Sequence, residues 1–88
     1  MPYIKPEDQK RIDSWLSDVR NKIGCIQNIG ELNYILSMIC KRFIPAKYSY
    51  EDLNGIMGVL ESVKQEFYRR VIVPYEQEKM AANGDVYE

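Results

Sequence analysis

The sequence predicts an all-α protein, and three features of the 88-residue chain support this fold class. Apolar residues recur at spacings of three and four through most of the chain, which is the periodicity of an amphipathic helix. No segment alternates apolar and polar residues for long, and no Asn-Gly or Asp-Gly pair lies between two β-branched runs. Residues that favour helix starts stand where each periodic segment begins. We therefore expect a single helical domain over residues 1–88.

The first periodic segment runs from Pro6 to Ile23. Pro6 suits the first position of a helix, and acidic Glu7 beside it would lie at the positive end of the helix dipole. Asp13 could instead begin a second short helix, so one bent helix and two short ones are both open. Gly24 ends the segment. Its apolar stripe consists of Ile12, Trp15, Leu16, Val19 and Ile23.

The second segment predicts an amphipathic helix over residues 29–44. Asn28 and Glu31 have the spacing of a capping box, and Pro45 closes the helix. Cys40 falls on the apolar stripe, where we expect it to be a small buried hydrophobic residue. The stripe consists of Leu32, Ile35, Leu36, Ile39, Cys40 and Phe43.

The third segment predicts a long helix over residues 50–73. Ser49 is a good N-cap with Asp52 three residues on. A heptad-like seam follows and continues through Val71 towards Tyr75. Pro74 removes a backbone donor, so it should kink or end the helix, with a further turn or two possible up to Ala82. The seam begins with Leu53, Ile56, Leu60, Val63 and Phe67.

The connection between the last two helices is short, which predicts that they form an antiparallel hairpin with the first segment packed on it. At 1.5 Å per residue the third helix would be about 36 Å long, longer than its partner. The end of this helix would therefore overhang, and we expect a second copy of the chain to cover it. The complete fold expectation is a helical hairpin with a short N-terminal helical segment, a long, Pro-kinked third helix and a tendency to form oligomers.

The composition excludes several functions. Twelve lysine and arginine residues against 13 acidic residues give a net charge of −1, which argues against binding bulk nucleic acid. The absence of histidine removes Ser-His and Cys-His nucleophile pairs and most zinc catalysis. Two cysteines are too few for a disulfide scaffold. We expect no membrane span and no signal peptide, and hence a cytoplasmic protein.

Small residues form a second stripe on the long helix, distinct from the seam. Each glycine inside a helix costs about 1 kcal/mol relative to alanine, so two of them need a reason. Close approach of another helix is one reason, and a solvent-facing surface that tolerates glycine is the alternative. We expect an oligomer interface along this stripe, which consists of Gly55, Gly58 and Ser62.

Arginines and tyrosines cluster around the expected kink. A guanidinium group suits a phosphate and an aromatic ring suits a base, so the cluster predicts a site for a nucleotide. The alternative is a helix with solvated arginines and with tyrosines at its rim. We expect Arg70 to pair with Glu66, and Tyr68 and Tyr75, seven apart, to share a face. The candidate ligand-binding residues are Asn33, Tyr34, Tyr68, Arg69, Arg70 and Tyr75.

Carboxylates are frequent, but no acidic pair with a spacing of three or four recurs on two helices. Helical bundles that hydrolyse nucleotides bind magnesium through such pairs. We therefore expect no catalytic residues, no metal, no cofactor and no enzymatic activity.

Five motifs stand out: Gly30-Glu31-Leu32-Asn33-Tyr34, Tyr50-Glu51-Asp52-Leu53-Asn54, Gly58-Val59-Leu60-Glu61, Glu66-Phe67-Tyr68-Arg69-Arg70 and Asn83-Gly84-Asp85-Val86-Tyr87. They resemble a family of short phage and prophage proteins that begin Met-Pro-Tyr-Ile. The resemblance covers almost the whole chain and implies a phage-encoded accessory protein, without implying a chemistry. In architecture alone the chain is also similar to small helical-hairpin phage proteins that sequester cyclic nucleotide or ADP-ribose immune signals as oligomers.

Together these features predict a non-enzymatic anti-defence protein. It would be an oligomeric sponge in the host cytoplasm that binds a nucleotide-derived signal between its subunits. The alternative is an inhibitor or scaffold that presents a helical face to a host protein. A nucleotide hydrolase is the third possibility.

Overall fold

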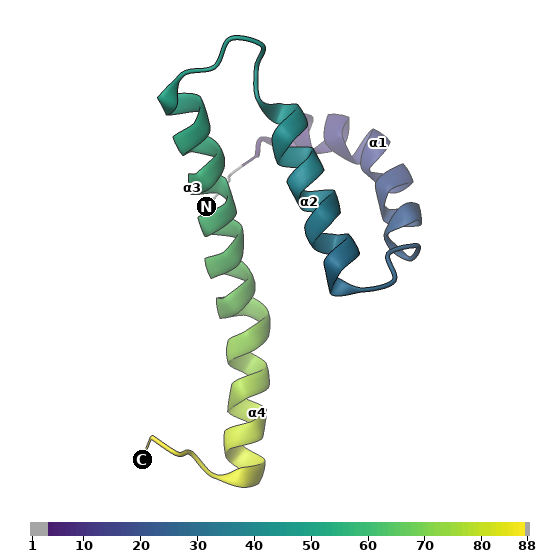
Figure 1. Ribbon diagram of the computed structural model, residues 1–88. Coiled ribbons are helices and arrows are strands. Elements are labelled where there is room, and N and C mark those ends of the chain that lie inside the picture. The colour runs from purple at the N-terminus through teal and green to yellow at the C-terminus, as the bar shows by residue number, and fades with distance from the viewer. Residues whose placement is uncertain (1–3, 88) are drawn as a thin grey trace. The chain divides into compact units, whose positions relative to one another are not determined.

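The computed structural model describes residues 4–87, which are helical without any strand (Figure 1). The described residues divide into two compact units, 4–46 and 47–87. The Met-Pro-Tyr start and Glu88 lie outside the described residues. The helices are α1 (Pro6–Ile23), α2 (Ile29–Phe43), α3 (Tyr50–Phe67) and α4 (Val73–Asn83), and a π-helical segment η1 (Tyr68–Ile72) joins α3 to α4.

Helix α1 is one uninterrupted helix, which decides between the two possibilities left by the sequence. Pro6 occupies its first turn as expected, and the Lys5 carbonyl accepts a hydrogen bond from the Gln9 backbone N–H at 2.9 Å. Asp13 lies inside the helix rather than at a cap, with its carboxylate 3.8 Å from the Arg20 guanidinium. Gly24 follows the last helical residue, as predicted.

Helix α2 begins with a variant of the capping box. The Asn28 side chain accepts a hydrogen bond from the Glu31 N–H at 2.9 Å, while the Glu31 carboxylate accepts one from the Gln27 N–H at 3.0 Å. In a standard box the second bond would come from the N–H of the cap residue itself. The helix ends at Phe43, within one residue of the predicted end, and the next residue, Ile44, is extended.

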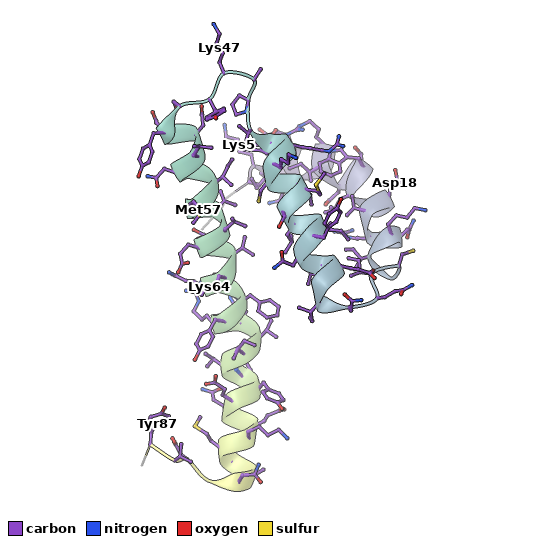
Figure 2. The ribbon with its side chains drawn as sticks, in the orientation of Figure 1. Lys5, Asp18, Lys47, Met57, Lys64 and Tyr87 are labelled. Carbon is purple, nitrogen blue, oxygen red and sulfur yellow. The ribbon has the colours of Figure 1, made fainter. Side chains whose placement is uncertain are left out.

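None of residues 4–87 is buried; Figure 2 shows their side chains along the helices. Cys40 is half-buried and Cys25 is exposed, and both thiols are free. The expectation of a buried Cys40 is therefore wrong, because residues 4–46 contain only two helices and cannot enclose a side chain on all sides.

The long helix extends beyond residue 73 through the further turns that the sequence left possible. It starts at the expected capping box, in which the Ser49 N–H donates to Asp52 Oδ2 at 2.9 Å and the Asp52 N–H donates to Ser49 Oγ at 3.3 Å. Segments α3, η1 and α4 then follow without a break, with 18, 5 and 11 residues. The helix is therefore about 50 Å long. It ends at Gly84, whose φ of 89° is favourable only for glycine.

Of the two outcomes predicted for Pro74, an end of the helix does not occur, and the π-helical segment gives the reason. Pro74 has no N–H, and in an α-helix its ring would clash with the carbonyl of Arg70. In η1 the backbone widens, and the Val73 N–H reaches back five residues to the Tyr68 carbonyl. The wider turn accommodates the proline, and α4 continues directly after it.

The predicted antiparallel hairpin would join α2 to α3, which belong to different units, and it stays a prediction. None of the helices in residues 4–87 combines length and apolar character in the way that a membrane span requires.

Candidate functional site

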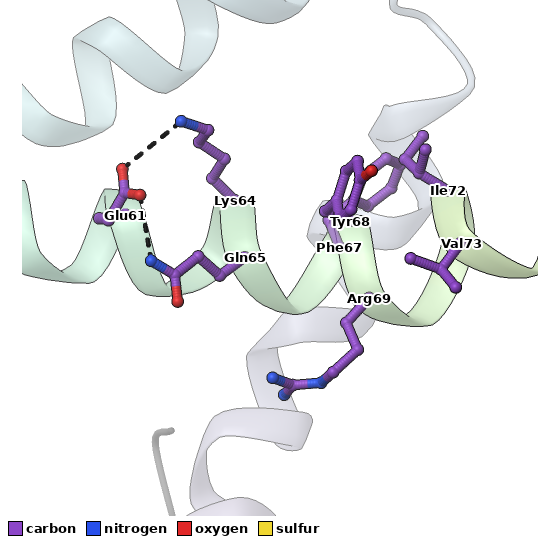
Figure 3. Close-up of a pocket in the computed structure, with 8 residues that line it drawn as sticks. All are labelled: Glu61, Lys64, Gln65, Phe67, Tyr68, Arg69, Ile72 and Val73. Atoms are coloured by element: carbon purple, nitrogen blue, oxygen red, sulfur yellow. Dashed lines mark hydrogen bonds and ion pairs between the residues drawn. The ribbon is translucent and has the colours of Figure 1, made fainter. Parts of the chain in front are cut away.

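An open hollow lies on the long helix around the π-helical segment (Figure 3). Its volume is about 680 Å³, and it is open to solvent. All of its lining residues come from one continuous helix, which forms a single wall. The lining residues are Glu61, Lys64, Gln65, Phe67, Tyr68, Arg69, Ile72 and Val73.

Arg69 and Arg70 both form ion pairs with Glu66. The Arg69 guanidinium bonds to Glu66 Oε2, and Arg70 Nε lies 3.1 Å from Glu66 Oε1. The expected pair of Arg70 with Glu66 is confirmed. Arg69 shares the same carboxylate because it lies three residues from it, a spacing that also brings helical side chains together. Two cations and one anion leave a local positive charge, and both guanidinium groups keep further N–H donors for another acceptor.

Tyr68 and Tyr75 have different partners. The Tyr68 hydroxyl donates a hydrogen bond to Glu76 Oε1 at 3.3 Å, eight residues along the chain. Lys79 Nζ lies 5.6 Å from the centroid of the Tyr75 ring, which is a cation–π distance. In a regular α-helix a spacing of seven keeps two residues on one face, but the π turn takes up about one extra residue. Glu76, rather than Tyr75, therefore lies on the face of Tyr68.

The six sequence-predicted ligand residues have separate locations. Tyr68 and Arg69 line the hollow, but Figure 3 shows their side chains leaving the helix in different directions. Arg70 and Tyr75 lie on the same helix outside the lining. Asn33 and Tyr34 belong to α2 in the other unit, where Asn33 Oδ1 accepts a hydrogen bond from the Ser37 hydroxyl at 3.3 Å.

Three polar residues that line the hollow were missed from the sequence. Glu61 binds two neighbours, with its carboxylate 3.8 Å from Lys64 Nζ and 3.1 Å from Gln65 Nε2 (Figure 3). Lys64 lies four residues before Tyr68, a spacing that places both on one helical face. That spacing was the signal available in the sequence. The hollow thus offers a second cation besides Arg69.

The small-residue stripe lies in open space within the protomer. A Cβ atom added at Gly55 or Gly58 would meet nothing within 4 Å, and Ser62 is exposed. No packing inside the described residues therefore requires glycine at these two positions.

Metal-binding groups are absent from the described part of the chain: no three His, Cys, Asp or Glu residues in it are placed to hold an ion. The carboxylates that flank the hollow are instead occupied by lysine, arginine and glutamine side chains.

No curated protein and no solved structure matches this chain. A family model does match, and it covers residues 1–86, which include all of the helices and the hollow described above. The chain therefore belongs to the family described as Domain of unknown function (DUF6899).

Proposed function

We propose that this protein is a non-enzymatic, phage-encoded binding protein that sequesters a nucleotide-derived signal as an oligomer. The observation that carries this proposal is the coincidence of the π-helical segment, the hollow and the Tyr-Arg cluster at residues 68–72. Short π-helical segments occur frequently at functional sites, because they displace side chains from regular helical positions.

The chemistry of the hollow suits an anionic ligand that carries an aromatic ring. Arg69 supplies N–H donors for a phosphate, and Lys64 and Arg70 add positive charge. Phe67 and Tyr68 supply ring faces on which a base can stack. The nearby carboxylates of Glu61 and Glu66 already form ion pairs with these cations. They are therefore not free to hold a metal ion, and the ligand would bind without one.

The oligomer supplies the enclosure that one helix lacks. Small-molecule sites usually bury most of their ligand, whereas this hollow has one wall and is open to solvent. A second protomer would provide the opposite wall. The stripe of Gly55, Gly58 and Ser62 is a further surface along which copies of the chain would approach closely.

Replacing Gly55 and Gly58 with alanine should stabilise the helix and weaken association. Each substitution favours the helix by about 1 kcal/mol, and the open space around both positions accommodates the methyl groups. Two added methyl groups would separate backbones that approach along the stripe. Circular dichroism and analytical ultracentrifugation of the double variant measure the two effects. Association equal to that of wild type would remove the stripe from the interface.

A thermal-shift screen with cyclic dinucleotides and ADP-ribose derivatives tests the proposed function. A ligand at about 100 times its Kd adds about 2.7 kcal/mol to the free energy of unfolding, which is a readily measured shift. We expect a shift with at least one phosphorylated compound and none with the matching nucleoside. Shifts of equal size with the nucleoside, or none with any phosphorylated compound, would contradict a phosphate-binding site.

The exposed apolar side chains favour a second candidate, a scaffold or inhibitor that presents a helical face to a host protein. Met57, Val59 and Val63 on α3 are each about 60% exposed. Amphipathic helices with such faces bind grooves on partner proteins. This candidate predicts that the melting temperature shifts with the partner protein and with none of the nucleotides. A nucleotide hydrolase, the third candidate, predicts that the nucleotide is chemically altered after incubation with the protein.

A further inference from the structure

The apolar seam of the long helix stays on one face through the π-helical segment. Leu60 and Phe67 are seven residues apart, as in a heptad, whereas Phe67 and Tyr75 are eight apart. The Tyr68–Glu76 hydrogen bond shows that residues eight apart across η1 lie on one face. The π turn thus keeps Tyr75 in line with Phe67. We define the distal seam as Val63, Phe67, Val71 and Tyr75.

The distal seam is exposed and lies on a helix that is longer than either α1 or α2. Phe67, Val71 and Tyr75 are 56%, 48% and 58% exposed. Helices α1 and α2 have 18 and 15 residues, and Figure 1 shows that the chain reverses direction between them. Their lengths are therefore about 27 Å and 23 Å, whereas the long helix is about 50 Å long.

The charges beside the distal seam are self-complementary in one orientation. Glu66 and Arg70 lie four residues apart on the same flank, as their ion pair at 3.1 Å shows. If two copies of the helix cross antiparallel about residue 68, Glu66 of each faces Arg70 of the other. A parallel pair would place Glu66 opposite Glu66 and Arg70 opposite Arg70, which is repulsive.

We infer that the distal seam binds the same seam of a second copy, antiparallel, with the two-fold axis near Tyr68. Such an interface is isologous, so each favourable contact occurs twice. Covering the seam and Tyr68 would remove roughly 600 Å² from each copy, about 1,200 Å² in total, the lower end of the range for specific interfaces. The inference rests on the oligomer of the proposed function and specifies its geometry.

This arrangement also completes the hollow. With the axis near residue 68, Tyr75 of the second copy lies opposite the turn that contains Glu61 and Lys64, two lining residues. The π turn places Tyr75 and Tyr68 of one copy on different faces of the helix. In the dimer, Tyr75 of the second copy lies at the hollow in place of Tyr75 of the first. The ligand would thus contact Tyr68 and Arg69 of one copy and Tyr75 of the other.

Distances between spin labels test the orientation without any ligand. The chain carries Cys25→Ser and Cys40→Ser, and a single label is attached at Gln65→Cys or Gln77→Cys. An antiparallel pair centred on residue 68 separates the labels along the axis by about 9 Å at position 65 and about 27 Å at position 77. We expect this large difference between the two positions. Equal distances at both positions, which a parallel pair gives, or no dipolar coupling at all would overturn the inference.

A matched pair of glutamine variants tests the surface. Phe67→Gln should raise the dimer dissociation constant at least tenfold, whereas Met57→Gln, on α3 outside the distal seam and 64% exposed, should leave it unchanged. Circular dichroism verifies that both variants keep their helix content. Equal association of the two variants contradicts the interface. Nucleotide binding that persists while these tests fail leaves the proposed function intact and removes only this interface.

Discussion

Pro74→Ala is expected to raise the free energy of unfolding by up to about 3 kcal/mol while weakening self-association. Alanine restores the missing N–H, which can donate to the Arg70 carbonyl, and removes the ring that the π turn accommodates. The helix then returns to regular α geometry. Everything after residue 72 rotates by about 100° relative to α3, so Tyr75 leaves the face of Phe67. The variant is therefore more stable and less able to associate.

Melting curves and analytical ultracentrifugation measure these two effects on the same samples. Gln77→Ala is the matched control, since it lies one turn further along α4, keeps Pro74 and should change the free energy of unfolding by less than about 0.5 kcal/mol. A Pro74→Ala protein that melts later and associates as tightly as wild type would show that the π turn does not align the seam. An unchanged melting temperature would show that Pro74 is not the cause of the π turn.

Arg69→Ala is expected to weaken binding of the phosphorylated ligand tenfold to a hundredfold. A charge-assisted hydrogen bond to a phosphate contributes about 1.5–3 kcal/mol, and Arg69 is the arginine that lines the hollow. The helix should keep its stability, because the side chain is 60% exposed and its pair with Glu66 lies on the surface. Isothermal titration calorimetry with the compound identified in the screen measures the affinity.

Two further variants separate ligand binding from a structural role for Arg69. Glu66→Gln removes the carboxylate that both arginines share and that faces Arg70 of the second copy, so it should weaken self-association and, with it, binding of the ligand. Arg20→Ala, on α1 in the other unit, is the neutral control. If Arg69 is only a solvated surface residue, all three variants bind the ligand as wild type does, and the proposed phosphate site is wrong.

Local signals in the sequence predicted most of the helix boundaries. Asn28 and Ser49 were correct caps, because each places an oxygen within reach of an N–H three residues on. Pro74 was interpreted as a kink or an end because proline normally terminates an α-helix. A π turn forms at a proline only if the residues after it have enough helix propensity to continue the helix. The proline by itself does not reveal whether they do.

The candidate site was predicted only in part. Tyr68 and Arg69 were found from their residue types, whereas Glu61, Lys64 and Gln65 were missed because they look like an ordinary charged surface. The pairing of Arg69 with Glu66 was also missed, because adjacent helical residues project about 100° apart and only Arg70 was expected to pair with this carboxylate. The face relation of Tyr68 and Tyr75 changed because of the π turn, which alters every spacing counted across it.

Sequestration without cleavage is the central claim, and equilibrium dialysis followed by chromatography of the nucleotide tests it most directly. The protein is incubated with each phosphorylated compound, the bound fraction is measured, and the protein is then denatured to release its ligand. We expect one compound to be retained with the protein and recovered chemically unchanged. Recovery of a cleaved nucleotide, or an equal distribution of every compound across the membrane, would contradict the account.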